Sequence, residues 1–311
     1  MKKRLLDWWS DVWFQRVDPA SAGLFRICIG LLMFAMLACL YTNWNAYYSL
    51  NGVQSLADPS LLQTPEDTWS VFYWTHGVIA VGAFWWIGIV AALGFCIGFQ
   101  TRLCTIVLYI LQTSLVHRNR WVANGEDLVF RMVLFYSCFA PLNQALSVDK
   151  WLDDRKPPAK RAFTQWPRIW PIRLIQINIA LIYVISLPNK LADDVAWWNG
   201  TAIYLSIVSN MWSRFPWPGL FYGRLSKLFT YGTLFTEGSF PILVWFRKTK
   251  LPAIAAVVGL HVGIAIMLKN VTFFSLSMAC SFLIFLPPEI IRAAVAKEWA
   301  AMSKRGAAEN G

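Results

Sequence analysis

Long stretches of apolar residues constrain this chain more than any other feature of its sequence. Residues 22–41, 77–99, 252–268 and 273–288 are mostly apolar. The hydrocarbon core of a bilayer is about 30 Å thick and takes roughly 17–25 such residues per helix. Only 14% of the 311 residues are charged, whereas a soluble domain carries about 25%. The sequence therefore predicts an integral membrane protein.

We expect an all-α fold, a bundle of about eight transmembrane helices within residues 18–290. The predicted spans are 22–41, 77–99, 103–116, 127–142, 172–187, 229–246, 252–268 and 273–288. Residues 1–17 alternate apolar side chains, several of them Trp, with charged ones at helical spacing. This pattern predicts an interfacial amphipathic helix, although a helix packed under the bundle would show it too. Residues 291–311 are predicted to form a basic cytoplasmic tail that is partly disordered.

The charges of the loops predict the orientation. Loop 42–76 contains acidic residues but no Lys or Arg, whereas 143–171 and the tail are rich in both. Because Lys and Arg accumulate in cytoplasmic loops, both termini are expected inside the cell. The long loops 42–76 and 188–227, rich in Trp and Tyr, then cover the outer face. The expected location is the inner membrane of a bacterium.

Several partner classes are disfavoured by the way residues are distributed. The net charge is +11, but the basic residues gather at the ends of the apolar stretches instead of forming a groove. Membrane lipids, and not nucleic acid, are therefore the expected partners. The six cysteines show no CxxC or Cys/His spacing, so neither a disulfide framework nor a metal site is predicted.

Ionisable residues in or beside the spans are the first candidates for function, because burying them is costly. Lys190 follows Gln176 and Tyr183 at intervals of seven, so the three share one helix face. Pro188 is predicted to break the helix just before Lys190. A lysine in a poorly hydrated site can act as a base. Alternatively, Lys190 anchors the helix end at the membrane interface by pairing with Asp193 or Asp194.

Glu237 and His261 lie near the middle of two consecutive predicted spans, so their depths match. A Glu–His pair at this depth is a candidate proton relay. A structural hydrogen bond between the two helices would place the residues in the same way, and both interpretations stay open. Arg26, near the inner end of the first span, is expected to extend its guanidinium to the membrane surface.

A polar segment joins the third and fourth predicted spans. It contains His117, Arg120, Asn124, Asp127 and Arg131, which we interpret as candidate substrate-binding residues. Asn124 begins an Asn-Gly turn, and Asp127 suits the first turn of the next helix. Part of this pattern therefore has a structural explanation.

Together these motifs resemble the horizontally transferred transmembrane (HTTM) domain family, which is related to the membrane half of vitamin K-dependent γ-carboxylase. The resemblance runs from about residue 18 to residue 288. The motifs are His117-Arg118-Asn119-Arg120, Asn124-Gly125-Glu126-Asp127, Asn189-Lys190-Leu191 with Trp197-Trp198, Glu237 with Phe240-Pro241, and His261 with Phe274-Ser275.

The resemblance implies a membrane enzyme. In the carboxylase, a lysine that matches Lys190 is the base that activates a reduced quinone. By this resemblance Lys190 would be the catalytic base. We group Glu237 and His261 with it as candidate catalytic residues, and Tyr183 and Trp198 as candidate substrate-binding residues. The implied cofactor is a reduced quinone, and the implied substrate is a lipophilic small molecule or a secreted peptide.

This chain departs from the carboxylase in two respects. Gly125 or Glu126 stands roughly where the carboxylase has a second important histidine. No segment of these 311 residues resembles its large lumenal domain. A non-enzymatic membrane accessory for the maturation or export of a secreted peptide is therefore the alternative. A transporter is disfavoured, because no inverted repeat is evident.

Overall fold

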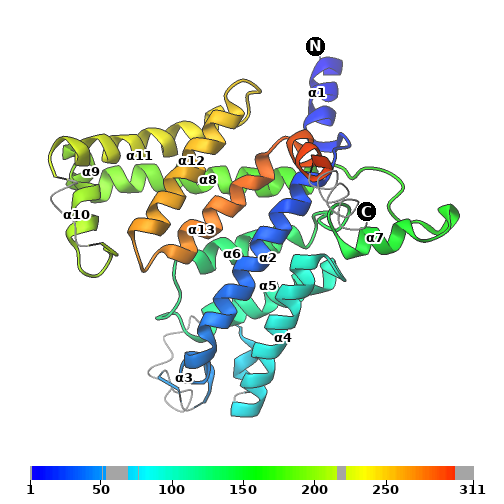
Figure 1. Cartoon of the computed structure of the whole chain (residues 1–311), viewed down its shortest axis with the longest axis horizontal. Helices are drawn as coiled ribbons and strands as arrows, with labels where there is room; N and C mark the ends of the chain where they lie inside the picture. The colour runs from blue at the N-terminus through cyan, green and yellow to red at the C-terminus, as the bar shows by residue number, and fades with distance from the viewer. Residues whose placement is uncertain (1, 51, 54–68, 76, 216–221, 298–311) are drawn as a thin grey trace, which may run out of the picture.

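The computed structural model describes residues 2–50, 52–53, 69–75, 77–215 and 222–297, and these are mostly helical (Figure 1). The helices are α1 (Lys2–Phe14), α2 (Ala20–Leu40), α3 (Trp44–Tyr48), α4 (Val78–Ile97), α5 (Thr101–Arg118), α6 (Gly125–Ser137), α7 (Val148–Asp154), α8 (Trp170–Asp193), α9 (Val195–Asn199), α10 (Ala202–Val208), α11 (Arg224–Leu243), α12 (Lys250–Met267) and α13 (Thr272–Ser281). Short 3-10 turns are η1 (Tyr41–Asn43), η2 (Val71–Tyr73), η3 (Pro158–Lys160) and η5 (Phe282–Phe285). Within these ranges no strand forms, only two isolated bridges.

Eight of the described helices pack in a closed circuit. The order of contact is α2, α4, α5, α6, α8, α11, α12, α13 and back to α2. Each of them corresponds to one predicted apolar stretch. The buried core runs through the circuit and includes Phe25, Phe95, Phe130 and Phe282. The predicted all-α bundle is therefore confirmed.

The eight helices of the circuit differ in whether they are long and apolar enough to cross a membrane. Four helical stretches of the described chain are long and apolar enough to cross a membrane, Ala20–Tyr48, Val78–Ile97, Trp170–Ala192 and Lys250–Met267. A fifth, Thr272–Phe285 with Pro288–Lys297, qualifies only as a pair bent by 98°. Helix α6 has only 13 residues, fewer than a hydrocarbon core needs.

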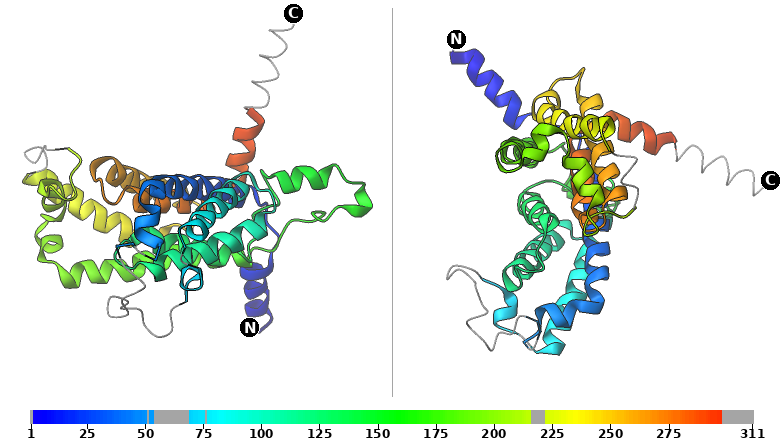
Figure 2. Two further views of the ribbon diagram at one scale, coloured as in Figure 1. Left: turned by 90° about the horizontal axis from the view of Figure 1, so that it is seen from below. Right: turned by 90° about the vertical axis from the view of Figure 1, so that its left-hand side faces the viewer.

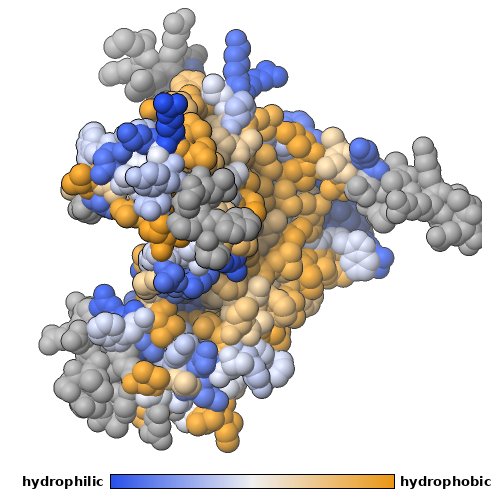
Figure 3. Space-filling model, turned by 60° about the vertical axis from the view of Figure 1, so that its left-hand side comes forward, coloured by the Kyte–Doolittle hydropathy of each residue, from blue (hydrophilic) through white to orange (hydrophobic). Residues whose placement is uncertain are grey.

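The outer surface of the bundle is strongly apolar. Large side chains face outward from several helices, for example Ile79 on α4 and Phe235 on α11, which are 91% and 74% exposed. Figure 3 shows a broad apolar flank and a hollow between the part around α9–α10 and the part around α3. Such a surface suits lipid, not water. The chain is an integral membrane protein.

Arg26 does not reach the membrane surface, contrary to the prediction. Its side chain is completely buried in α2, where it donates hydrogen bonds to four backbone carbonyls, those of Cys96, Leu142, Ala145 and Leu146. The first of these carbonyls lies in the last turn of α4, and the other three lie in the connection after α6. Carbonyls at such places have no partner within a helix. Arg26 is thus a structural clamp.

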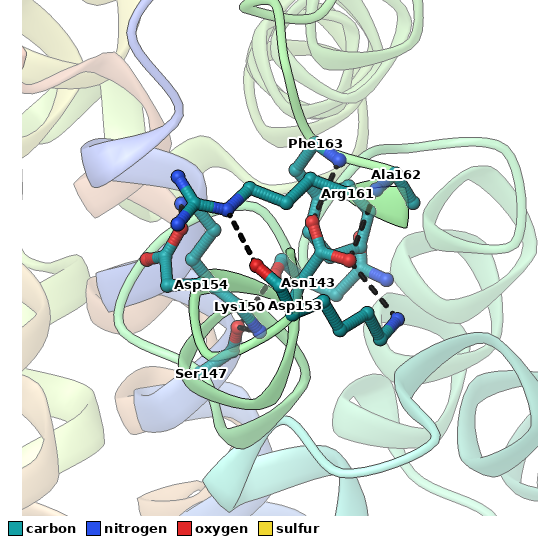
Figure 4. A network of polar contacts seen from close by, with 9 residues as sticks. Asn143, Ser147, Lys150, Asp153, Asp154, Arg161, Ala162 and Phe163 are labelled. Carbon is teal, nitrogen blue, oxygen red and sulfur yellow. Dashed lines mark hydrogen bonds and ion pairs between the residues drawn. The ribbon is translucent and has the colours of Figure 1, made fainter. Parts of the chain in front are cut away.

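A polar network orders the connection that follows α7. The carboxylate of Asp153 accepts hydrogen bonds from the backbone N–H groups of Ala162 (2.9 Å) and Phe163 (2.8 Å) and from Lys156 (Figure 4). These bonds, the backbone ones foremost, lower the pKa of Asp153 to about 2. Asp149 similarly accepts from the N–H groups of Gln100 and Thr101, which joins α7 to the start of α5.

Both ends of the described chain lie at the same end of the bundle as α7, toward the upper right of Figure 1, whereas α3, α9 and α10 lie toward the left. Helix α1 and the helix over Pro288–Lys297 leave the bundle on opposite sides (Figure 2). The helical prediction for residues 1–17 is confirmed by α1. The predicted disordered end of the tail lies outside the described residues.

Candidate functional site

Lys190 and Glu237 form an ion pair between α8 and α11. The Nζ atom of Lys190 lies 2.5 Å from Oε2 of Glu237. The Glu237 side chain is 5% exposed and that of Lys190 is 27% exposed, so the lysine is the accessible member of the pair. Lys190 also lies 4.9 Å from the centre of the Trp197 ring, a cation–π contact. Glu237 is about 20 Å along α11 from its first residue, at 1.5 Å per residue.

This pair corrects two predictions. Helix α8 continues through Pro188 to Asp193, so Lys190 belongs to its last turns and does not follow a break. A proline removes only one N–H donor, and helices packed in membranes tolerate that loss. Asp194, a predicted anchor for Lys190, instead accepts the backbone N–H of Ala196 at the start of α9. The side chain of Asp193 lies outside the described part.

His261 pairs with Tyr183, not with Glu237 as predicted. The Tyr183 hydroxyl lies 2.6 Å from Nε2 of His261, which joins α8 to α12. Nδ1 of His261 is buried and has no hydrogen-bond partner among the described residues. Whichever nitrogen carries the proton, this ring keeps one polar atom unsatisfied, which is rare in folded proteins.

The predicted polar face of α8 exists and binds three other elements. Gln176 donates to the carbonyl of Ile284 (3.0 Å), Tyr183 bonds His261, and Lys190 bonds Glu237. Residues seven apart on a helix are about 10 Å apart along its axis. The Tyr183–His261 and Lys190–Glu237 pairs therefore follow one another along α8. Aromatic rings of Phe240 and Phe282 surround Tyr183.

The other predicted residues gather at the junction of α5 and α6. Nδ1 of His117 lies 2.8 Å from the carbonyl of Trp69, and its Nε2 lies 3.4 Å from Arg131. One neutral tautomer satisfies both bonds, with Nδ1 donating and Nε2 accepting. Asp127 accepts from the N–H of Asn124 (2.7 Å) and from Gln112 (2.6 Å). Asn124 and Asp127 therefore shape the start of α6, as the turn pattern suggested.

Arg120 and Trp198 stay at the surface. Arg120 is exposed in the connection between α5 and α6. Trp198 is exposed in α9, and its indole N–H donates to the carbonyl of Leu191 (2.6 Å). The structure thus divides the predicted site residues into two groups, one along α8 and one at the α5–α6 junction.

Sequence reasoning missed Trp197 and Gln112 as parts of these groups. Trp197 lies in α9 beyond the end of α8 and reaches back over Lys190, and Gln112 lies 15 residues before Asp127 on the preceding helix; both contacts depend on how the chain turns between two helices. Among the described residues, no group of His, Cys, Asp and Glu could hold a metal ion.

Comparison with known proteins identifies the family. A family model described as the HTTM domain matches residues 14–289, which include α2 to α13 and every residue of both groups. No curated protein and no solved structure matches the chain. With most of its length matched, this chain belongs to the HTTM domain family.

Proposed function

We propose that this protein is a membrane enzyme in which the Lys190–Glu237 pair takes a proton from a lipophilic or peptide substrate. The observation that carries the proposal is the pair itself, an accessible ammonium on a buried carboxylate. Ionisable groups inside a membrane bundle are costly and are typical of functional sites. Lys190 is also the residue that the family resemblance implies as the base.

The Lys190–Glu237 pair can accept the proton of a substrate in two steps. A base must be neutral when it accepts a proton, so the ammonium of Lys190 first transfers one proton to Glu237, its partner at 2.5 Å. The neutral amine then takes a proton from an acidic O–H or C–H of the substrate. The pair ends as an ammonium and a carboxylic acid, with one added positive charge, next to a substrate anion. That added charge stabilises the anion.

A reduced quinone fits this chemistry, and it is the partner that the family's relation to the carboxylase implies. A quinol supplies an aromatic hydroxyl as the proton donor. Lys190 and Glu237 would bond that hydroxyl, and the indole of Trp198, exposed in α9, offers a stacking surface nearby. Tyr183 and His261 would position the end of α8 through their hydrogen bond.

The proposal places the pair near the outer face of a bacterial inner membrane. It assumes about eight spans, with both termini and the basic α7 segment inside. Both ends of the described chain lie toward the same end of the bundle as α7, which supports this arrangement (Figure 1). An even number of spans is needed for both termini to share one side.

A non-enzymatic accessory for a secreted peptide is the second candidate. Exposed aromatic side chains on the segments predicted to lie outside favour it, since Tyr and Trp are frequent in binding surfaces. They are Trp69, Trp74, Trp121, Trp198 and Tyr222. In this role Lys190 would only join α8 to α11.

The deciding experiment replaces Lys190 by arginine in the native host. Arginine keeps the positive charge and can pair with Glu237, but it cannot deprotonate in proteins. If Lys190 is the base, the Lys190→Arg variant loses the phenotype of the intact gene while expression and thermal stability stay near those of the wild type. Lys269→Arg, at an exposed lysine outside both groups, is the matched control and keeps the phenotype.

The opposite outcome identifies the accessory. A Lys190→Arg variant with full function would exclude Lys190 as a base. A stable complex with a secreted protein that persists in Lys190→Ala would then favour the second candidate. Mass spectrometry of lipophilic molecules that co-purify with the wild type gives an independent test of the quinone.

A further inference from the structure

A lateral cavity lies beside α6, on a different part of the bundle from the Lys190–Glu237 pair. It measures about 530 Å³, within the range of small-molecule sites. Its walls come from α5, α6, α8 and α13 and are almost entirely apolar or aromatic. They include Tyr109, Leu128, Met132, Phe135, Ile182 and Phe274.

Among the described residues that line this cavity, Arg131 is the one with a charge. Its side chain is half-buried, and within the same part of the chain its hydrogen bond is the 3.4 Å contact with Nε2 of His117. Within the described chain no carboxylate lies within 4 Å of its guanidinium. Asp127, one turn earlier, directs its two oxygens at Asn124 and Gln112 and does not line the cavity. Asp127 acts on Arg131 through its charge alone, so N–H donors of the guanidinium are available for a bound anion.

We infer that this cavity binds an anionic amphiphile, with its carboxylate or phosphate head on Arg131 and its hydrocarbon chain along the aromatic walls. Guanidinium is the side-chain group that best matches a planar or tetrahedral oxyanion. The cavity is open toward the lipid-facing surface, since Leu128 on its rim is 57% exposed. A molecule can therefore enter sideways from the bilayer.

The site stands independently of the proposed enzyme reaction. Phe274 lines the cavity and also packs edge-on against His261, with ring centres 6.0 Å apart. The cavity and the α8 group thus share a wall but no charged residue. Two sources supply the required chemistry, an anionic phospholipid and a free fatty acid.

The test uses the full chain in nanodiscs of phosphatidylcholine, a zwitterionic lipid. The probes are a photoreactive long-chain fatty acid and its neutral methyl ester, and the readout is labelling of α6 and α13 by mass spectrometry. We expect the acid to label at least about tenfold more efficiently than the ester, a difference of about 1.4 kcal/mol. Arg131→Gln should abolish that preference, whereas Arg131→Lys should retain part of it.

A second variant tests the cavity without touching the charge. Leu128→Trp fills the rim and should suppress labelling by both probes. Leu103→Trp, at a leucine that is 60% exposed on α5 and does not line the cavity, should label as the wild type does. Competition by added phosphatidylglycerol would identify a phospholipid as the occupant, and competition by unlabelled fatty acid alone would identify a free acid. Equal labelling by acid and ester in the wild type, or full labelling of Leu128→Trp, would overturn the inference.

Discussion

Replacing Lys190 and replacing Glu237 should lower the free energy of unfolding by different amounts, although both changes break the same ion pair. Lys190→Met leaves Glu237, whose side chain is 5% exposed, as a buried carboxylate without a cation. Removing one partner of a buried pair costs about 3–5 kcal/mol, and we expect about 3 kcal/mol because the lysine is partly solvated. Glu237→Gln leaves an ammonium that keeps water and the Trp197 ring. Its expected cost is about 1 kcal/mol.

The double variant measures the interaction between Lys190 and Glu237 apart from their contacts with other residues. Lys190→Met with Glu237→Gln leaves no charge at this position, so its cost should be about 2 kcal/mol, less than that of Lys190→Met alone.

The measurement is reversible unfolding of the purified protein in mixed micelles, titrated with a denaturing detergent and followed by tryptophan fluorescence. The m-values must agree across the four proteins for the free energies of unfolding to be compared. Equal costs of the two single variants, or strictly additive costs, would refute the idea that the exposed lysine neutralises a buried glutamate.

Three further predictions follow from the fold. Arg26→Met should destabilise the protein by about 3 kcal/mol in the same titration, because buried carbonyls lose their donor. For topology, Val53→Cys should react with a membrane-impermeant thiol reagent in intact cells, in a background without the native cysteines, and Ala159→Cys should not; the reverse result would invert the orientation. The segment at 155–163 should stay docked on Asp153 above about pH 4, the range of an unfolded carboxyl, and loosen as the pH falls toward the pKa of about 2, measured by hydrogen exchange.

Periodicity and apolar length were enough to predict the long helices. Each of the eight predicted stretches contains one, because an apolar block in a bilayer must satisfy its backbone hydrogen bonds internally. The short helices α3, α7, α9 and α10 lie in segments that were expected to be loops. The predicted end of α8 was wrong, since the expected stop at Pro188 was based on the missing N–H of proline alone. In the bundle, packing on α11 keeps the helix intact to Asp193.

Arg26 shows a different limit of sequence reasoning. Its position near a span end is equally compatible with a side chain that reaches the membrane surface and with one that points inward. The hydrogen-bond acceptors of Arg26 are the backbone carbonyls of four residues, Cys96, Leu142, Ala145 and Leu146. Every residue has a carbonyl, so the sequence does not show which of them accept from a distant side chain. Long-range contacts of this kind need the fold.

Partner choice within the candidate site was decided by depth along α8, which the sequence misjudged. The sequence placed Glu237 and His261 at matched depths on consecutive helices, whereas their partners on α8 are seven residues apart, about 10 Å along its axis. In the structure Glu237 turns toward α8 and meets Lys190, while His261 meets Tyr183 seven residues earlier on the same helix. A polar face on α8 therefore binds both, and each of the two finds a different partner along it. The chemical consequence is that the Glu237 carboxylate is paired with the Lys190 ammonium. His261 forms its hydrogen bond with the Tyr183 hydroxyl and bonds no carboxylate among the described residues.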